Sequence, residues 1–322
     1  MAGFFYMKGR DGMKYSEWNF RVLFSHCITI VLWGSAFPGI RVGLEAYTPE
    51  HLTLLRLLIA SFALVILAVI RRMRLPELKD IPVIFILGGL GFTVYHITLN
   101  YGEKSVSAGP ASLIVSVTPI ITAVLALIFF REKFKLWGWI GGAVSFIGVA
   151  LISISTGDEL GFNTGILLIL IAAISESLFF VFQKPFLKKY GSLPFTVYTI
   201  WAGTVLMLIF LPGLGSEIVK APIEVTLSAV YLGLFPTVLP YIALAYITSH
   251  AGASEATSSL YLTPAFACFI SWIWLGEVPT MLSILGGVIT IFGVVLAHIK
   301  NEKDHYIRIE RTNDVNKSHS MF

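Results

Sequence analysis

One acidic side chain lies within a run of otherwise uncharged residues. Glu176 is thirteen residues into the apolar segment 163–183, about 20 Å along a helix at 1.5 Å per residue, which places it past the middle of a membrane. A charge at the centre of a bilayer costs at least ~2.5 kcal/mol and usually faces a partner or a watery cavity. Glu176 could therefore bind a substrate amine or a proton. Alternatively, it forms a structural ion pair or is a protonated carboxyl that is hydrogen-bonded inside a helix bundle.

Arg56 is a second charged residue inside an apolar segment. It lies five residues into the segment 51–70, near the expected outer membrane surface. A guanidinium at this depth could extend to the headgroups along its aliphatic stem, as long basic side chains often do. The alternative is that Arg56 binds a substrate carboxylate.

Three polar residues lie together near the end of the apolar segment 81–101. His96 and Asn100 are four residues apart and share a helical face, with Tyr95 beside it. Such a face suits the wall of a polar cavity, and His96 could also carry a proton. The simpler alternative is a histidine that only makes hydrogen bonds within a packed helix interface.

Aromatic residues supply the apolar part of a candidate site. Six of them could line a mostly apolar pocket or simply pack in the core: Trp33, Phe37, Phe180, Trp201, Tyr241 and Tyr261. Four of these six and the polar residues form the predicted substrate-binding set: Trp33, Phe37, Arg56, Tyr95, His96, Asn100, Glu176, Trp201 and Tyr241.

The elements that must position these residues are membrane helices. Apolar residues form 56% and charged residues 13% of the 322-residue chain, whereas soluble domains average about 25% charged residues. Mean hydropathy is +0.81. Ten apolar stretches approach the roughly 20 residues that a helix needs to cross a bilayer: 24–43, 51–70, 81–101, 108–130, 136–155, 163–183, 193–212, 223–246, 253–275 and 280–299. We therefore predict an all-α membrane protein with ten transmembrane helices, of which 223–246 could be broken at Pro236 or Pro240.

The chain contains two versions of one segment. A shift of 145 residues aligns Thr118 and Pro119 with Thr263 and Pro264. Copies that each cross the membrane five times must be inverted relative to one another, which is the architecture of many secondary transporters. Pro119 and Pro264 should bend their spans, so they are candidate hinge or kink residues, although packing alone would also explain them.

This duplication predicts how the chain is divided. Two cytoplasmic tails flank two inverted five-helix repeats, with boundaries at 1–23, 24–155, 156–299 and 300–322. Lys and Arg accumulate in short loops on the cytoplasmic side, and most of the 23 basic residues fall in alternate loops or in the tails. We therefore predict a multi-pass protein of the plasma membrane with both termini in the cytoplasm.

Several function classes are excluded by the motifs that the sequence lacks. We find no Walker loop, dinucleotide-binding fingerprint or HExxH motif, so no enzyme, cofactor or metal site is predicted. Cys27 and Cys268 fall within predicted spans, where we expect buried free thiols. The net charge of +4 reflects topology and gives no reason to expect nucleic-acid binding. Small-residue faces around Gly148 and Gly293 indicate close helix packing, within the chain or in a homodimer.

Short motifs follow one another along the chain, and those from Thr118-Pro119 on recur in the same order in the second half, which departs from the first near the counterparts of Trp33 and Arg56. Those of the first half are Trp33-Gly34-Ser35-Ala36-Phe37, Leu55-Arg56, Ser107 to Leu113, Thr118-Pro119, Arg131-Glu132 and Gly141-Gly142; those of the second are Thr263-Pro264, Gly276-Glu277 and Gly286-Gly287. Their order and duplication resemble the EamA family, within the drug/metabolite transporter superfamily. The resemblance implies a ten-helix carrier, often an exporter, that works by alternating access around a central cavity.

The functional prediction is a secondary transporter that moves small metabolites, such as amino acids, related compounds or drugs, across the plasma membrane. Its expected partners are a small-molecule substrate and the lipid bilayer. The alternative is a non-transporting membrane scaffold or sensor that retains the fold. An intramembrane enzyme ranks third, because no nucleophile is paired with a base in the sequence.

Overall fold

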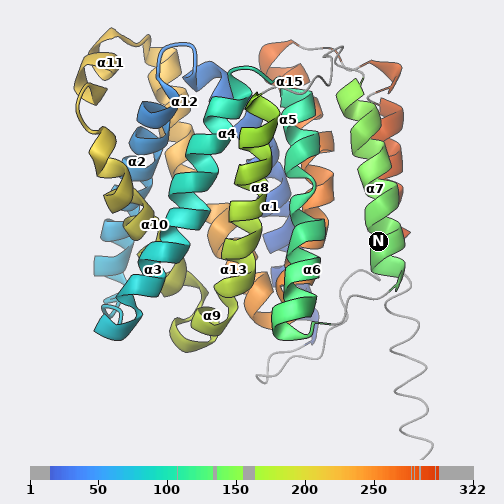
Figure 1. Cartoon of the computed structure of the whole chain (residues 1–322), viewed down its shortest axis with the longest axis horizontal. Coiled ribbons are helices and arrows are strands. Elements are labelled where there is room, and N and C mark those ends of the chain that lie inside the picture. The colour runs from blue at the N-terminus through green and yellow to red at the C-terminus, as the bar shows by residue number, and fades with distance from the viewer. Residues whose placement is uncertain are drawn as a thin grey trace, which may run out of the picture.

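The chain folds into a bundle of helices that run between two ends of the molecule (Figure 1). The computed structural model describes residues 15–106, 108–132, 136–154, 164–276, 278, 280–282, 284–293 and 295–296. No strand occurs among these residues, which confirms the all-helical prediction for the described part of the chain.

Seven helical segments are long and apolar enough to cross a membrane. They are Phe20–Gly43, Pro49–Ile70, Leu78–Glu103, Thr164–Phe182, Ser192–Phe210, Ile223–Ala251 and Ala253–Trp274. Three shorter apolar helices accompany them: Thr118–Phe130, Leu136–Gly148 and Ile284–Gly293. The protein is therefore a multi-pass membrane protein, and the predicted number of ten crossings requires that the shorter helices also span the bilayer.

The order of elements follows the predicted segments closely. The first half contains α1 (Tyr15–Gly43), α2 (Pro49–Ile70), η1 (Leu78–Asp80), α3 (Ile81–Gly88), η2 (Gly89–Val94), α4 (Tyr95–Glu103), α5 (Ala108–Val115), α6 (Thr118–Phe130) and α7 (Leu136–Ile154). The second contains α8 (Thr164–Phe182), α9 (Lys184–Tyr190), α10 (Ser192–Met207), η3 (Leu208–Phe210), α11 (Leu214–Lys220), α12 (Ile223–Leu234), α13 (Leu239–Ala251), α14 (Ala253–Ser258), η4 (Ser259–Leu262) and α15 (Thr263–Leu275). The short apolar helix Ile284–Gly293 follows α15.

Three predicted spans are broken in the middle. The stretch 108–130 divides into α5 and α6, and the stretch 253–275 divides into α14, η4 and α15. Proline lacks an N–H and fits the first turn of a helix, so Pro119 and Pro264 each begin a new helix where a bend within a continuous one was expected. The break that was anticipated in 223–246 is also present, between α12 and α13.

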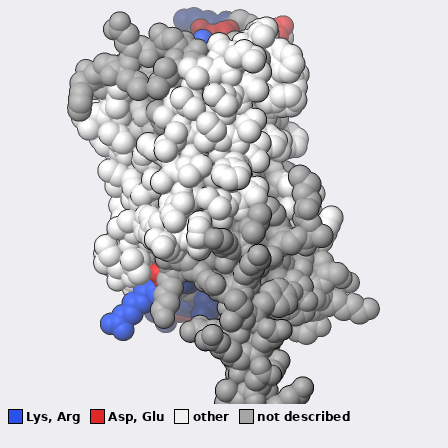
Figure 2. Space-filling view, turned by 90° about the vertical axis from the view of Figure 1, so that its right-hand side faces the viewer, with Lys and Arg blue, Asp and Glu red and all other residues white. Residues whose placement is uncertain are grey.

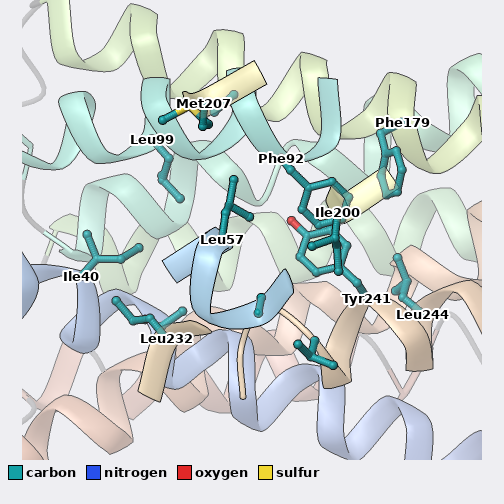
Figure 3. Packing of buried hydrophobic residues seen from close by; sticks show 14 of the residues in the cluster. Ile40, Leu57, Phe92, Leu99, Phe179, Ile200, Met207, Leu232, Tyr241 and Leu244 are labelled. Carbon is teal, nitrogen blue, oxygen red and sulfur yellow. The ribbon is translucent and has the colours of Figure 1, made fainter. Parts of the chain in front are cut away.

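Aromatic packing joins the two halves of the chain. The segment η2 is one π-helical turn between α3 and α4, and it carries the fully buried ring of Phe92. This ring packs 4.6 Å from the ring of Tyr241 on α13 and 5.4 Å from that of Phe179 on α8, measured between centroids. Figure 3 shows the Phe92 and Tyr241 rings facing one another. The contact fixes η2 and the start of α4 against the second half.

Helix α7 and the helix Ile284–Gly293, which correspond under the repeat shift, cross each other with reciprocal contacts. Ser145 on α7 donates its hydroxyl to the carbonyl of Thr290 at 3.1 Å, and Thr290 donates to the carbonyl of Ser145 at 3.4 Å. These residues are 145 positions apart, which is the repeat shift. Since each residue makes the contact that its counterpart makes, a local two-fold axis passes between the two helices.

Glycines on the same two helices repeat this exchange. A Cβ on Gly148 would lie 2.5 Å from the carbonyl oxygen of Gly286, and a Cβ on Gly293 would lie 2.7 Å from that of Gly141. Residue numbers rise along one helix as they fall along the other, so the helices are antiparallel. The small-residue faces therefore pack within the chain at this crossing.

The lateral surface is apolar. On the face shown in Figure 2, acidic and basic side chains of the described residues lie only near the two ends. Large apolar side chains such as Phe62, Ile128 and Ile209 are exposed on the sides, as expected for contact with lipid. Cys27 is exposed and Cys268 is partly exposed, so the prediction that both thiols are buried was wrong; each lies on a helix face that is not fully covered by neighbours.

The reciprocal crossing predicts matched mutational effects. Gly148→Ala and Gly293→Ala should each lower stability by about 1–3 kcal/mol, because the added methyl group meets backbone atoms that cannot rotate away. The midpoint of thermal unfolding in detergent measures this. Gly287→Ala is the control, because its nearest neighbour would be 3.9 Å away. Equal stability of Gly287→Ala and Gly293→Ala would contradict the crossing.

Candidate functional site

One cavity lies where the helix breaks of the two halves meet. It encloses about 590 Å³ of empty space, a volume that includes space open to solvent. Its walls come from both halves: Trp33, Ala36, Phe37, Ile40, Arg56, Tyr95, His96, Leu99, Ser112, Val115, Ser116, Thr118, Glu176, Leu260, Thr263 and Pro264.

The cavity is displaced towards one end of the bundle. Ile40 is three residues from the end of α1, Leu99 is four residues from the end of α4, and Ser112 is four residues from the start of α5. These helix termini lie at the same end as α11 (Figure 1). Glu176 lies past the middle of α8, six residues before its end at Phe182. The cavity therefore extends from the middle of the bundle towards the α11 end.

The structure brings six of the nine predicted substrate-binding residues to this cavity. They are Trp33, Phe37, Arg56, Tyr95, His96 and Glu176. Tyr241 lies directly behind the wall and contacts Glu176. Asn100 and Trp201 make contacts elsewhere. Of the two predicted hinge residues, Pro264 lines the cavity, and Pro119 follows the lining residue Thr118.

Arg56 is held inside the bundle and does not reach the membrane surface. Its side chain is only 2% exposed, and its Nε donates a hydrogen bond to Thr237 Oγ1 at 3.0 Å. Thr237 in turn donates to the carbonyl of Leu232 at 2.8 Å. The prediction that Arg56 extends to the headgroups was therefore wrong. The break between α12 and α13 brings Thr237 next to the guanidinium of Arg56. The hydrogen bond between them directs the guanidinium into the bundle.

Glu176 is equally buried and has a phenolic neighbour. It is 2% exposed, and the hydroxyl of Tyr241 lies 3.4 Å from its Oε1. Neither Glu176 nor Arg56 forms an ion pair with any residue in the described part of the chain. The structural ion pair considered for Glu176 is therefore absent there. Each side chain lines the cavity without an oppositely charged side chain in contact, and the Tyr241 contact fits the alternative of a hydrogen-bonded carboxyl at Glu176.

The tautomer of His96 follows from its backbone contact. Nδ1 lies 2.9 Å from the carbonyl oxygen of Phe92, and because a carbonyl can only accept, Nδ1 carries the proton. Neutral His96 then has a lone pair on Nε2. The ring lines the cavity, so this nitrogen is an acceptor for a ligand.

Trp33 is fixed as one wall of the cavity. Its Nε1 donates to the carbonyl of Pro236 at 3.1 Å. Its ring stacks on Phe180 with centroids 6.0 Å apart and meets Tyr241 edge-on at 5.1 Å. Because the indole N–H is already satisfied, the ring offers only an apolar surface to a ligand.

Asn100 and Trp201 join helices instead of facing the cavity. The Nδ2 of Asn100 donates to Thr53 Oγ1 at 2.9 Å, which ties α4 to α2. The Nε1 of Trp201 lies 3.4 Å from the carbonyl of Ser61, across the contact between α10 and α2. Both residues belong to the packing that surrounds the site.

Two hydroxyls at the cavity were missed as individual candidates. Thr118 and Thr263 line the wall, and the Oγ1 of each is buried without a hydrogen-bond partner in the described structure. They are related by the repeat shift and begin the half-helices α6 and α15. The paired Thr-Pro motif was the signal that could have identified them. Helix starts of this kind orient N–H dipoles toward the site.

A contact between the halves lies at the opposite end from the cavity mouth. The carboxylate of Glu132, just after α6, pairs with the Nζ of Lys184 on α9. It also accepts hydrogen bonds from the N–H groups of Ala253 at 3.3 Å and Ser254 at 3.2 Å, at the start of α14. Burial alone would raise the pKa of Glu132, but these hydrogen bonds and the lysine lower it below its ordinary value.

Gly252 allows this close approach. It has a φ of 96°, a conformation that strongly favours glycine. A Cβ there would lie 2.8 Å from Glu132 Oε2. We call the contacts of Glu132 with Lys184, Ala253 and Ser254 the Glu132 latch.

The groups that line the cavity are suited to binding a small molecule. Among the described residues, no group of three or more His, Cys, Asp or Glu side chains is placed to hold a metal ion. The cavity combines a cation, a carboxyl, an imidazole acceptor and an aromatic wall, in a bundle that crosses a membrane. An arrangement of this kind can bind a small polar molecule at membrane depth.

Comparison with known proteins gives the family. The profile of the EamA-like transporter family matches the chain twice, over residues 21–154 and 163–299. The chain therefore belongs to the EamA-like transporter family, and the resemblance seen in its motifs is confirmed. Family membership indicates a transporter and not an enzyme.

Two relatives that are named as transporters align with this chain over most of their length. An uncharacterized transporter, YdfC, of Bacillus subtilis is 58% identical over 289 residues, which are 90% of this chain and 94% of that protein. A probable terminal-alkyne amino-acid exporter of Streptantibioticus cattleyicolor is 38% identical over 270 residues, covering 84% of this chain and 90% of the other.

A solved structure shares the fold. A crystal structure with 16% sequence identity superposes with a TM-score of 0.72, covering 88% of this chain and 98% of its own. At this identity the similarity shows the overall arrangement of helices and nothing about the ligand.

The cavity predicts a pattern of chemical access. In a variant without native cysteines, Ser116→Cys should react with a membrane-impermeant thiol reagent, because Ser116 lines the space that opens toward the α11 end. Ser177→Cys is the control, since Ser177 is fully buried and donates to the carbonyl of Thr118 at 3.2 Å. We expect a labelling rate at least about tenfold higher at 116, because the control requires local opening. Equal rates would show that the cavity is closed to water.

Proposed function

We propose that this protein is a secondary transporter that moves small metabolites, in particular amino acids or related compounds, across the plasma membrane by alternating access, as an exporter. The observation that carries the proposal is the cavity of an EamA-like transporter, lined by buried Arg56 and Glu176, neither of which forms an ion pair within the described residues. Buried charges without countercharges are costly, and in membrane proteins they mark substrate or ion pathways. The name of the Streptantibioticus relative supports amino acids as the substrate class and export as the direction.

The architecture that supports alternating access is a pair of inverted five-helix repeats. We divide the chain at 24–155 and 156–299, and count the three shorter apolar helices as spans, so that ten helices cross the membrane. The reciprocal, antiparallel crossing at Ser145 and Thr290 supports a two-fold relation between the halves. The family profile matches once in each half. Rocking of one half against the other would then open the two ends in turn.

The proposed orientation places the Glu132 latch at the cytoplasmic side. Arg71 directly after α2, Arg131 directly after α6 and the short helix α9 with Lys188 lie at the same end as the latch, and basic connections between spans favour the cytoplasm. Both termini are then cytoplasmic, as the sequence predicts. With this orientation, the structure represents a state whose cavity extends outward and whose inner end is closed.

Alternating access also requires that the outer end of the cavity closes when the inner end opens. Glu103, at the outer end of α4, is 9% exposed, and both of its carboxylate oxygens are buried without a hydrogen-bond partner in the described structure. The positive charges that act on it electrostatically are Arg56 and Arg41. Closing the outer end can bring this carboxylate into contact with an arginine while the Glu132 latch opens.

A scaffold or sensor without transport remains the second candidate. It would retain the fold and the latch, but it would have no need for unpaired charges in a cavity. Substituting those charges with apolar residues would then be silent or stabilising, whereas a carrier should lose flux.

Flux in proteoliposomes tests the proposal. Vesicles that contain the purified chain should exchange labelled L-leucine faster than empty vesicles, with and without an imposed pH gradient. Glu176→Leu and Arg56→Leu should each lower the initial rate at least about tenfold, since each removes a charge from the binding cavity. Lys220→Gln, at an exposed site on α11, serves as the control. Absence of flux across a panel of amino acids and their analogues would favour the scaffold or sensor.

The Glu132 latch gives a second test. Glu132→Gln removes the charge that Lys184 pairs with, so the inner end should open more often. A hydrogen bond to a charged group contributes about 1.5–3 kcal/mol. In this background Thr122→Cys, on α6 between latch and cavity, should react about 10- to 100-fold faster with a thiol reagent applied at the latch end. Glu77→Gln, which removes an exposed ion pair at the same end, is the control. An unchanged rate in Glu132→Gln would show that the latch does not close the pathway.

A further inference from the structure

The cavity is lined by one basic and one acidic side chain that form no ion pair with each other. Arg56 comes from α2 in the first half and Glu176 from α8 in the second. Both line the same space, both are 2% exposed, and neither forms an ion pair within the described residues. A ligand that supplied both missing countercharges would be a zwitterion.

Arg56 has hydrogen-bond donors to spare. A guanidinium carries five N–H groups, and the contact with Thr237 uses only the one on Nε. That contact sets the plane of the group and leaves the two terminal nitrogens for a ligand in the cavity. Two parallel N–H donors match the two oxygens of a carboxylate.

The cavity also offers hydrogen-bond acceptors. Glu176 supplies carboxyl oxygens, one of which lies 3.4 Å from the hydroxyl of Tyr241. His96 supplies Nε2, because its Nδ1 proton is committed to the carbonyl of Phe92. An ammonium group has three donors and no acceptor, so it matches acceptors of this kind.

The rest of the cavity wall is mainly apolar, with hydroxyl groups from Ser112, Ser116, Thr118 and Thr263. Side chains without hydrogen-bonding groups contribute most of the remaining wall: Ala36, Phe37, Ile40, Leu99, Val115 and Leu260. Trp33 adds an indole face whose N–H already donates to Pro236. No third charged residue lines the space in the described structure. A charged side chain on the ligand would therefore lack a partner.

We propose that the cavity binds an amino acid with an uncharged, apolar side chain as a zwitterion, with its carboxylate at Arg56, its ammonium group at Glu176 and His96, and its side chain against Trp33 and Phe37. The inference rests on the proposed function and assigns the substrate class of that same site. It also assigns separate roles to the two side chains: Arg56 binds the carboxylate of the ligand, and Glu176 binds its ammonium group.

The separation of roles makes the proposal testable with matched ligands. Removing one charged group from the ligand leaves one buried protein charge without a partner, and sites built around hydrogen-bonded groups discriminate strongly against such analogues. L-Leucine, 3-methylbutylamine and 4-methylpentanoate share one side chain. The amine lacks the carboxylate, and the acid lacks the ammonium group.

Binding of these three probes is measured with the full chain in lipid nanodiscs, by competition against labelled L-leucine for the wild type and by calorimetry for the variants. The wild type should bind leucine about 10- to 100-fold more tightly than either analogue. In Arg56→Gln the advantage of leucine over 3-methylbutylamine should disappear, while its advantage over 4-methylpentanoate remains. In Glu176→Gln the reverse should hold.

Two conservative variants separate recognition from folding. Arg56→Lys and Glu176→Asp keep the charges and should keep the wild-type order of the three probes, even where affinity falls. Lys220→Gln should match the wild type throughout. Thermal unfolding of each variant verifies that it is folded.

The contrary results are equally specific. If Arg56→Gln weakens all three probes by the same factor, the arginine is structural and the zwitterion assignment is wrong. If the wild type prefers 3-methylbutylamine over leucine, the site is an amine site, and the assignment is again wrong although transport can still stand. If the wild type moves no solute at all in vesicles, the proposed function itself fails.

Discussion

The bilayer core provides no water to solvate a charge, and this constraint governs the site. Arg56 and Glu176 are almost completely buried at membrane depth, and neither is neutralised by a contact ion pair in the described chain. Such groups are tolerated where they face a hydrated cavity. The cavity is therefore a requirement for these two residues to be charged, and the bundle around it must leave that space open.

The architecture meets this requirement through breaks in its helices. A continuous helix satisfies its own backbone, whereas α5/α6 and α14/η4/α15 interrupt theirs at the cavity wall. The hydroxyls of Thr118 and Thr263 stay unpartnered beside these breaks. The break between α12 and α13 has another task, because it places Thr237 under the guanidinium of Arg56. The same irregularities that weaken the bundle locally thus build its polar chamber.

Much of this arrangement could be predicted from the sequence, and the failures have physical causes. The apolar segments and the repeat shift of 145 identified most of the helices and the two matched Thr-Pro positions, although these were expected to be bends and are the starts of α6 and α15. Hydropathy records only how apolar a segment is, so it could not show that Asn100 faces Thr53 or that Trp201 faces Ser61. The inward direction of Arg56 depends on Thr237, which is 181 residues away in the chain. Contacts over such distances leave no periodic signal in a single sequence.

The central claim is that two inverted halves expose one cavity to opposite sides in turn. Distances between spin labels at both ends of the full chain in nanodiscs test it directly, with one pair at positions 131 and 188 near the Glu132 latch and the other at 45 and 220 near α11. We expect two populations for each pair, and any change of pH or added L-leucine that lengthens one distance should shorten the other. Distances that stay fixed at both ends, or that lengthen at both ends together, would contradict the account.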